Sequence, residues 1–287
     1  MTATGRVAVL GAGTMGHGIA QVHAMAGYEV ALADATLELA RRGSDRIRAN
    51  VDEGVRRGKL TEDERDAALA RITAYDDVAA AARDAAVVIE AVPERMETKV
   101  AVLTAAEAAA SAGALLATNT SGLSVTRMQE ALQRPDRMLG LHFFNPVHIN
   151  RLVEVVRGAH TTDETLAAGL ALVSAIGKEA VVVRDSPGFA TSRLGVLLGL
   201  EAMRMLEEDV ASAADIDRAM ELGYRHPMGP LRLTDLVGLD VRLDIARYLY
   251  AELGLEQFRP PRVLERMVAE GRLGRKAGRG FYDWSDD

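Results

Sequence analysis

The sequence predicts an α/β protein in which a doubly wound, mostly parallel sheet with an inserted helical hairpin precedes an all-α C-terminal domain. Three observations predict this class. A glycine-rich turn joins a short apolar run to a helical stretch near the N-terminus. Short β-rich runs then alternate with helical stretches, as in parallel sheets covered by helices. From about residue 186 onward only helical periodicity is left, so we divide the chain into domains 1–185 and 186–287.

Size and composition set the broad class. A chain of 287 residues has room for two domains. Its net charge of -7 argues against nonspecific nucleic-acid binding, which needs a basic surface. The absence of cysteine excludes a disulfide framework and a thiolate metal site, and we expect no bound metal. No apolar run reaches about 18 residues and the N-terminus lacks a signal-peptide pattern, so we expect a cytoplasmic protein that does not bind membranes.

The glycine-rich turn lies between two predicted strands. Residues 6–10 form a β-rich run that ends in Gly11-Ala12-Gly13-Thr14-Met15-Gly16, and a helical pattern and a second strand at 29–33 follow. In this pattern the first glycine makes a tight turn, the second lets backbone approach a pyrophosphate, and the third allows close helix packing. Asp34 ends the second strand and would accept hydrogen bonds from ribose hydroxyls while repelling a 2'-phosphate. The turn therefore predicts a Rossmann-type dinucleotide site that prefers NAD to NADP.

The remaining elements follow from periodicity and turn residues. A helical hairpin is predicted over 36–71, broken near Gly58, and Thr61 with Glu64 forms a capping-box pattern before its second helix. Further strands are expected at about 72–75, 86–92, 114–118, 138–144, 151–156 and 179–183. In the second domain we expect helices at about 189–207, 213–222, 235–253 and 261–270. A helical domain this small often completes its core against a second copy, so we expect a homodimer.

A histidine and a glutamate on neighbouring predicted strands are candidates for acid–base chemistry. His142 lies near the end of an apolar run that stops at the turn Asn145-Pro146, and Glu154 lies in the next strand. If the two strands pair, the side chains face each other, and a carboxylate that accepts a hydrogen bond from an imidazole stabilises its charged form. That arrangement suits a general base. The segments 92–94 and 119–121 follow strand ends and are expected on the cofactor side of the sheet.

Seven motifs in order resemble those of the short-chain 3-hydroxyacyl-CoA dehydrogenases, including the bacterial 3-hydroxybutyryl-CoA dehydrogenases. The resemblance extends along essentially the whole chain. It implies a Rossmann-type domain followed by a helical substrate and dimerisation domain, and an oxidoreductase of fatty acid metabolism. The matching segments are 11–16, 119–121, 140–146, 152–155, 186–189, 226–230 and 274–282.

The resemblance also implies roles for individual residues. His142 matches the family's base and Glu154 its partner, while Ser121 matches the serine that hydrogen-bonds the reacting oxygen. In the oxidative direction His142 would take the hydroxyl proton as a hydride leaves for the nicotinamide. Together with the glycine turn, the family pattern gives these cofactor-binding candidates: Gly11, Gly13, Thr14, Met15, Gly16, Asp34, Glu94, Lys99, Asn119, Asn145 and Lys276.

The sequence departs from the family pattern at three places. Ser192 replaces an active-site asparagine, and losing a well-placed polarising donor typically costs about 3 kcal/mol of transition-state stabilisation. Asn150 makes the substrate side of the loop after the base more polar. In the hairpin, Arg56 can stand in for a lysine that contacts coenzyme A, whereas Asp52 replaces a serine and would repel its phosphates. We therefore assign Ser192 to catalysis and Ser121, Asn150 and Arg56 to substrate binding.

Three functions remain open from the sequence. The leading one is NAD-dependent oxidation of a 3-hydroxyacyl thioester such as 3-hydroxybutyryl-CoA, or the reverse. An alternative is a dehydrogenase of a more polar hydroxyacyl group on an acyl carrier protein in a biosynthetic pathway. The hairpin arginines would then face the acidic carrier. A second alternative is a noncatalytic NAD-binding protein, which the missing asparagine would fit.

Overall fold

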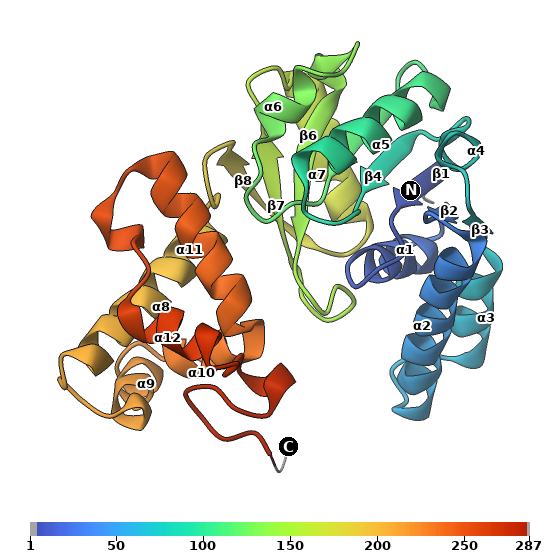
Figure 1. Ribbon diagram of the computed structural model, residues 1–287. Helices are drawn as coiled ribbons and strands as arrows, with labels where there is room; N and C mark the ends of the chain where they lie inside the picture. Colours follow the sequence, from blue (N-terminus) through green and yellow to red (C-terminus); the bar gives the residue numbers. More distant parts are fainter. Residues whose placement is uncertain (1–4, 286–287) are drawn as a thin grey trace. The chain divides into compact units, whose positions relative to one another are not determined.

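An eight-stranded sheet forms the centre of the first of two units in this computed structural model (Figure 1). The strand order is β3-β2-β1-β4-β5-β6-β7-β8, and every neighbouring pair is parallel except β6 and β7. The predicted doubly wound, mostly parallel sheet is therefore confirmed. The strands are β1 (Arg6–Leu10), β2 (Glu29–Ala33), β3 (Ile72–Tyr75), β4 (Val87–Glu90), β5 (Leu115–Thr118), β6 (Met138–Phe143), β7 (Leu152–Arg157) and β8 (Glu179–Arg184).

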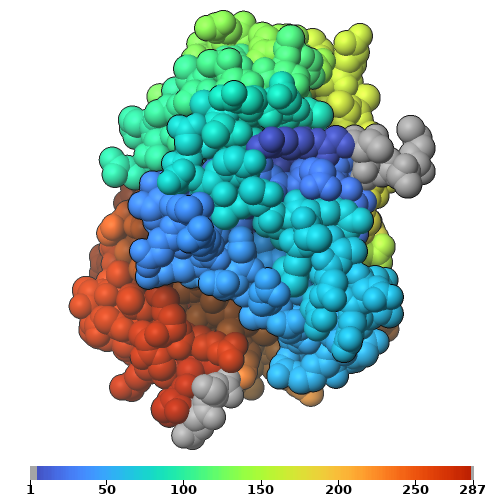
Figure 2. All heavy atoms as spheres, turned by 90° about the vertical axis from the view of Figure 1, so that its right-hand side faces the viewer, coloured from blue at the N-terminus to red at the C-terminus, as the bar shows by residue number. Residues whose placement is uncertain are grey.

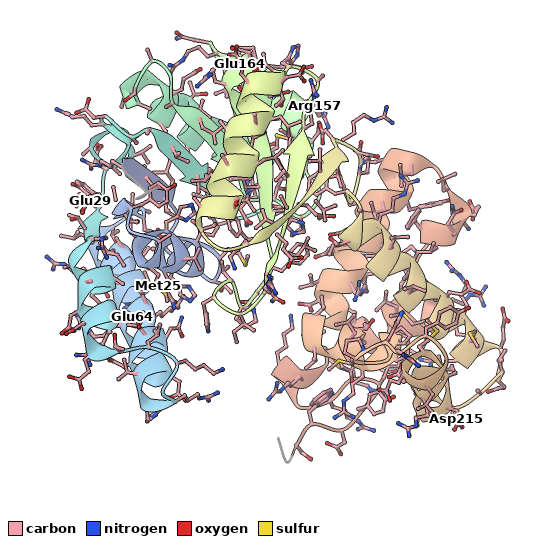
Figure 3. The ribbon with its side chains drawn as sticks, turned by 180° about the vertical axis from the view of Figure 1, so that it is seen from behind. Met25, Glu29, Glu64, Arg157, Glu164 and Asp215 are labelled. Atoms are coloured by element: carbon pink, nitrogen blue, oxygen red, sulfur yellow. The ribbon has the colours of Figure 1, made fainter. Side chains whose placement is uncertain are left out.

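The structure describes residues 5–285, which divide into two compact units between Ser186 and Pro187. In the first unit, helix α7 lies across β6, β7 and β8, with Glu164 in its first turn (Figure 3). No helix among the described residues is long and apolar enough to cross a bilayer. The helices of this unit are α1 (Gly16–Met25), α2 (Leu37–Arg56), α3 (Glu62–Ala70), α4 (Val78–Ala82), α5 (Met96–Ala109), α6 (Val125–Gln129), the 3-10 turn η1 (Pro135–Arg137) and α7 (Asp163–Ala175).

The glycine turn between β1 and α1 has the geometry that its residues predict. Gly11 has a φ of 102°, and a Cβ there would lie 2.6 Å from the carbonyl oxygen of Ala91. A Cβ on Gly16 would collide with the carbonyl of Gly11, whereas one on Gly13 would meet nothing within 4 Å. The first and third glycines thus allow the turn to close, and the second leaves open space beside it.

Each helix of the hairpin formed by α2 and α3 begins with a capped turn. Thr36 accepts a hydrogen bond from the amide of Leu39 before α2. Thr61 and Glu64 form a complete capping box at the start of α3, as the sequence predicts. The two helices pack on each other and on α1, and their outer surface is visible in shades of blue in Figure 2. The hairpin is therefore a rigid insertion between β2 and β3.

The second unit is built from helices around one apolar core. The sequence predicts one helix over 235–253, and this prediction is wrong. The chain instead forms two helices that meet at Gly238, whose φ of 103° breaks the helical backbone. The described helices are α8 (Thr191–Glu207), α9 (Ala213–Gly223), α10 (Pro230–Val237), α11 (Leu239–Leu253), α12 (Arg262–Ala269), and the 3-10 turns η2 (Glu256–Phe258) and η3 (Arg275–Ala277).

A buried aspartate fastens the C-terminal segment to this unit. Asp235 on α10 accepts hydrogen bonds at 2.9 Å from the amides of Phe281 and Tyr282 and from the indole of Trp284. Asp217 on α9 accepts the hydroxyl of Tyr282 at 2.7 Å. Because Asp235 satisfies backbone donors of this irregular segment and Asp217 binds its tyrosine hydroxyl, the segment can lie against the helices without losing hydrogen bonds.

His23 on α1 is a histidine buried in the core of the first unit. Its Nδ1 hydrogen-bonds the carbonyl of Ile19 at 2.8 Å, and its Nε2 has no hydrogen-bonding partner among the described residues. The ring packs against those of Tyr28 and Phe143. Burial lowers the pKa of His23 to about 4, because the charged form loses its hydration and lies near Lys178, and the bond to Ile19 only partly offsets this.

This burial predicts a pH-dependent stability. Between pH 6.5 and about 4 the unfolded chain binds a proton at His23 that the folded chain does not, so the free energy of unfolding falls as the pH drops through this window. His23→Phe should remove about 2 kcal/mol of that fall between pH 7 and pH 4.5. Urea unfolding at about pH 7 and pH 4.5 measures it. An equal fall in the variant would contradict the assignment, and His160→Gln, at an exposed histidine, is the control.

Candidate active site

His142 and Glu154 lie directly opposite each other on the antiparallel strands β6 and β7. The His142 Nδ1 is 2.8 Å from the Glu154 Oε2, and the two residues are 5% and 0% exposed. With Nδ1 bonded to the carboxylate, Nε2 is the nitrogen that can accept a proton. The ring of Phe144 lies 4.4 Å from the imidazole, centroid to centroid. The predicted facing of histidine and glutamate is thus present in the fold, within a nearly dry environment.

The turn after β5 connects this pair to the neighbouring strands. The side-chain oxygen of Asn119 accepts the amide of Phe143 at 3.0 Å, next to His142. The exposed Ser121 gives its amide to the carboxylate of Glu94 at 2.9 Å. The same carboxylate oxygen accepts the hydroxyl of Thr120 at 2.5 Å. The segments that follow β4 and β5 therefore form one hydrogen-bonded edge beside β6, as expected for the carboxyl ends of parallel strands.

Asp34 binds the glycine turn directly. Its Oδ2 accepts the amide of Ala12 at 2.7 Å and its Oδ1 accepts the amide of Ala35 at 2.7 Å. A carboxylate oxygen accepts more than one hydrogen bond, so the remaining lone pairs can meet ribose hydroxyls. The turn also leaves open space at Gly13, where a Cβ would have no neighbour within 4 Å. These residues fit a dinucleotide such as NAD: backbone for its pyrophosphate and a carboxylate for its ribose.

The loop between β6 and β7 is held by two side chains. Asn150 donates from Nδ2 to the carbonyls of Asn145 at 2.8 Å and Phe144 at 3.4 Å. Lys178 donates to the carbonyls of Val147 at 2.6 Å and Asn150 at 2.5 Å. The bond between Asn145 and Pro146 is cis. Asn150, predicted as a substrate residue, thus uses its amide nitrogen to shape the loop that follows His142.

The other predicted residues lie in different surroundings. Arg56 is the last residue of α2 and forms an ion pair with Glu53. Ser192 is half-buried in the first turn of α8 in the second unit. Lys276, also in the second unit, forms an ion pair with Asp240 at 2.6 Å. The structure therefore groups His142, Glu154, Asn119, Glu94 and Ser121 at one edge, and it leaves Arg56 on the hairpin.

Sequence reasoning missed four polar residues of this edge. Glu90 at the end of β4 and Thr118 at the end of β5 are both fully buried, and their side chains are 2.5 Å apart. Thr120 also accepts the amides of Gly122 and Leu123. Lys178 holds the loop after β6. A polar residue that ends an otherwise apolar strand was the available signal, because such positions meet at the carboxyl edge of the sheet.

A basic cavity of about 420 Å³ lies in the first unit between the hairpin, α1 and the loop after β6. Met25, labelled in Figure 3, is part of its apolar wall. Its basic lining residues are Lys59, His148, Arg151 and Lys178, and no acidic residue lines it. Burial lowers the pKa of His148 and of Lys178. The cavity thus combines apolar walls with an excess of positive charge.

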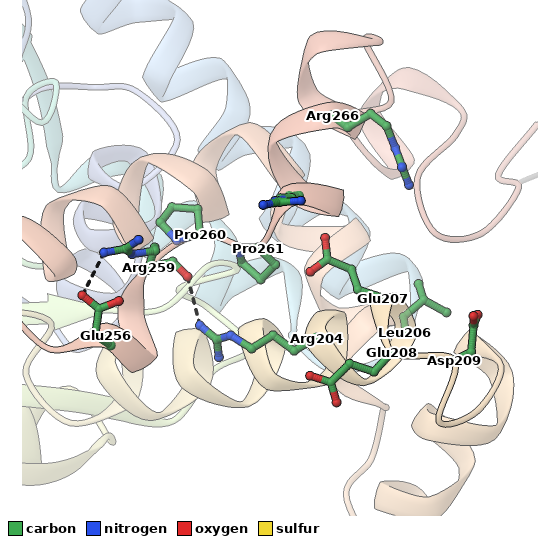
Figure 4. A pocket seen from close by; sticks show the side chains of 11 residues that line it. Arg204, Leu206, Glu207, Glu208, Asp209, Glu256, Arg259, Pro260, Pro261 and Arg266 are labelled. Atoms are coloured by element: carbon green, nitrogen blue, oxygen red, sulfur yellow. Dashed lines mark hydrogen bonds and ion pairs between the residues drawn. The ribbon is translucent and has the colours of Figure 1, made fainter.

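A second cavity, of about 790 Å³, lies in the second unit near the C-terminal end of α8 (Figure 4). Arg204 spans it by donating to the carbonyls of Gln257 and Arg259. Arg259 pairs with Glu256 at 2.9 Å. No predicted site residue lines this cavity, and several of its charges are bound to one another, so it is not the candidate active site.

Comparison with protein families settles the class. Residues 6–186 match the model of the 3-hydroxyacyl-CoA dehydrogenase NAD-binding domain, and residues 188–284 match that of the 3-hydroxyacyl-CoA dehydrogenase C-terminal domain. The chain belongs to the 3-hydroxyacyl-CoA dehydrogenase family. It is an NAD-dependent oxidoreductase that interconverts 3-hydroxyacyl and 3-ketoacyl thioesters, which sets aside the noncatalytic alternative.

Individual relatives agree with this membership. The chain is 40% identical to a probable 3-hydroxybutyryl-CoA dehydrogenase of Bacillus subtilis, over 98% of each. It is 41% identical to a 3-hydroxyadipyl-CoA dehydrogenase of Escherichia coli, over 97% of this chain and 58% of that one. Among solved structures, (S)-3-hydroxybutyryl-CoA dehydrogenase PaaH1 from Ralstonia eutropha has a TM-score of 0.94 at 39% identity and covers 98% of this chain and 99% of its own.

Proposed function

We propose that this member of the 3-hydroxyacyl-CoA dehydrogenase family acts on 3-hydroxybutyryl-CoA or a close relative, with His142 as the general base. The observation that carries the proposal is the buried hydrogen bond of 2.8 Å between His142 and Glu154. Relatives named for 3-hydroxybutyryl-CoA support the choice of acyl group. We further propose a cytoplasmic role in fatty acid metabolism, because acyl-CoA thioesters are intermediates of that metabolism.

In the oxidative direction, His142 removes the proton from the substrate hydroxyl through Nε2. NAD, when bound, supplies the acceptor for the hydride that leaves the carbon bearing this hydroxyl. Glu154 holds the proton on Nδ1 and stabilises the imidazolium that forms, which keeps the accepting nitrogen at the substrate. Ser121 donates a hydrogen bond to the reacting oxygen, and we assign a second donor role to Ser192 because it matches the family's asparagine.

The binding of NAD is assigned to the glycine turn and to the residues at the strand ends. The amides of Gly13, Thr14 and Met15 would bind the pyrophosphate, and Asp34 would accept hydrogen bonds from the ribose hydroxyls. Asn145 and Lys276 are assigned to the cofactor because they match the family's motifs. Support for the turn comes from the open space at Gly13 and from the hydrogen bonds that hold the Asp34 carboxylate in place.

The roles of His142 and Glu154 predict a graded loss of turnover. We expect His142→Ala to lower kcat by about 100- to 10,000-fold, because it removes the group that takes the proton. Glu154→Gln should lower kcat less, because its amide oxygen still accepts a hydrogen bond from Nδ1 but its charge is gone. Formation of NADH from 3-hydroxybutyryl-CoA measures both effects. NADH binding, followed by fluorescence titration, should stay within about twofold of wild type.

His160→Ala is the matched control, since His160 is exposed and lies outside the candidate site. Its kcat should equal that of wild type. Full turnover by His142→Ala would sink the assignment of the base. Weak NADH binding by that variant would instead point to a histidine that supports the fold of the cofactor site.

For the coenzyme A part of the substrate we propose the basic cavity beside the hairpin. Its lining residues Lys59 and Arg151 carry charges opposite to those of the coenzyme A phosphates. The apolar wall suits the pantetheine chain. Arg56, one turn from the cavity on α2, is available to the outer phosphates once it leaves Glu53. An excess of positive charge without a lining acid is the observation that supports this placement.

Charge reversal at Lys59 should therefore affect only substrates that carry the nucleotide. An exposed charge pair is worth about 1 kcal/mol in water, and reversing one charge doubles the effect to about 2 kcal/mol, so Lys59→Glu should raise KM for 3-hydroxybutyryl-CoA about 30-fold. KM for 3-hydroxybutyryl-N-acetylcysteamine, which lacks the nucleotide, should be unchanged. Arg46→Glu makes the same charge change on α2 outside the cavity and is the control. Equal effects of Lys59→Glu on both thioesters would contradict the placement.

The carrier-protein alternative predicts a different outcome of the same assay. If the natural substrate is held on an acyl carrier protein, wild type turns over the carrier-bound hydroxyacyl group much faster than the coenzyme A ester. Arg46→Glu then lowers activity on the carrier, because that arginine would face an acidic surface. Ser192→Asn restores the family's residue and distinguishes two explanations of low activity with the coenzyme A ester. If Ser192 is a weakened polarising donor, this variant raises kcat with that ester. If the natural carrier is a protein, kcat with that ester stays low.

We also propose that two copies associate through the second unit. Six apolar residues on three mutually packed helices are each more than a third exposed: Leu194, Leu198, Leu233, Leu236, Val237 and Val241. They lie on α8, α10 and α11. Exposed apolar side chains on helices that pack together are typical of an interaction site, and a second copy is its expected occupant for this family.

Light scattering of the purified protein tests this association. Wild type should have twice the mass of one chain. Leu194→Glu with Leu198→Glu should have the mass of one chain, because a second copy would bury four carboxylates in an apolar interface. Leu39→Glu places a charge on a comparably exposed leucine of α2 and should leave the mass unchanged. A wild-type protein with the mass of one chain would overturn the proposal.

A further inference from the structure

Lys99 in the first turn of α5 has a fully buried side chain. Its Nζ donates to Glu90 at 2.9 and 3.2 Å and to the carbonyl of Asn119 at 2.9 Å, and it forms an ion pair with Glu94 at 3.3 Å. An ammonium group has three donors, and protein oxygens surround all of them. Lys99 thus has no exposed surface in this structure through which to reach a ligand.

Glu90 is the partner that makes this burial possible. It is 0% exposed and also accepts the amide of Val92 at 2.6 Å and the hydroxyl of Thr118 at 2.5 Å. Burial raises the pKa of Glu90, and the charge of Lys99 and these hydrogen bonds oppose the rise. Glu90 itself lies on β4, and the donors described around its carboxylate come from β5, α5 and the segment after β4. The ion pair is therefore the junction of these elements.

A buried ion pair does not by itself indicate a contribution to stability. Replacing a buried ion pair by neutral groups of similar volume is often neutral or stabilising, whereas removing one partner is costly. The charges instead determine which groups the Lys99 side chain contacts. Within residues 5–285, Lys99 is the one cation that contacts both Glu94 and the carbonyl of Asn119, which lie in different turns. Glu94 in turn holds the amide of Ser121, and the Asn119 side chain holds the amide of Phe143, next to His142.

We propose that Glu90 is a positioning residue for the dehydrogenase reaction and that it acts through Lys99 on Glu94 and on the turn from Asn119 to Ser121. The inference rests on the proposed function, because the role of Ser121 comes from there. Lys99 acts on the cofactor edge from within the protein, through Glu94 and the carbonyl of Asn119. With Glu90 neutral, Lys99 pairs with Glu94 alone and draws that carboxylate away from the Ser121 amide.

Three variants of the full-length protein test the inference: Glu90→Gln, Lys99→Met and the double variant. Each is measured for unfolding midpoint in urea, for NADH affinity by fluorescence, and for kcat and KM with 3-hydroxybutyryl-CoA. Each single variant leaves a buried charge without its partner and should be less stable than wild type. The double variant has a neutral interior, so its unfolding midpoint should return toward that of wild type.

Measurements of kcat distinguish a positioning role of Glu90 from a role in stability alone. The double variant should keep a kcat reduced about tenfold or more at a temperature where it is fully folded, because small displacements of reacting groups have effects of this size or larger. Recovery of kcat together with the unfolding midpoint would overturn the inference, since the pair would then act only on stability. Glu107→Gln is the matched control: Glu107 is another buried glutamate of α5, and it binds the amides of Gln133 and Arg134. It should lose stability and retain kcat.

The two proposals fail in distinguishable ways. If His142→Ala keeps full turnover, the proposed function is wrong whatever the Glu90 variants do. If His142→Ala is inactive while the double variant is as active as wild type, the proposed function stands and the inference about Glu90 is wrong. A reduced kcat in His142→Ala and in the double variant supports both the proposed function and the role of Glu90.

Discussion

The antiparallel pairing of β6 with β7 is the constraint on which the candidate active site depends. All other neighbouring strands of the sheet are parallel, and this one reversal places His142 directly opposite Glu154. Side chains alternate between the faces of a strand, so a register shift of one residue would turn the two groups to opposite faces. The register is secured on both sides: Asn119 binds the amide of Phe143, and β8 pairs along the whole length of β7. A buried acid and base can then be held 2.8 Å apart without a mobile loop.

Two lysines donate hydrogen bonds to backbone carbonyls of the turns at the carboxyl edge of the sheet. Strands that end at the carboxyl edge pass into irregular turns, whose carbonyls lack the partners that a helix or ladder would provide. Lys99 donates to the carbonyl of Asn119, and Lys178 donates to the carbonyls of Val147 and Asn150. In both cases a long side chain crosses from a neighbouring helix or strand end to a turn of the candidate site. The turns gain fixed geometry, and each cation gains the acceptors that its partial or complete burial requires.

In the structure, two of the three departures from the family pattern have hydrogen-bond or ion-pair partners within the protein. Asn150 replaces an apolar residue, yet its amide nitrogen binds the carbonyls of its own loop. In the hairpin, Arg56 pairs with Glu53, and Asp52 lies 3.6 Å from Arg65 of α3. These polar groups are partnered within the first unit, which lowers their weight as evidence for a different substrate. Ser192 is the departure that still bears on chemistry, because a hydroxyl is shorter than the amide it replaces.

The sequence by itself determined the features that depend on local backbone or on short periods. The glycine turn, the capping box at Thr61 and the facing of His142 with Glu154 are of this kind, because the residue types act within a few positions or alternate along one strand. It did not predict the break at Gly238, since helical periodicity continues across that residue. Only the tertiary structure decided which charges meet in the interior. Glu90, Lys99 and Asn119 belong to three elements that the sheet order brings together, and a buried charge takes its partner from whatever lies beside it in space.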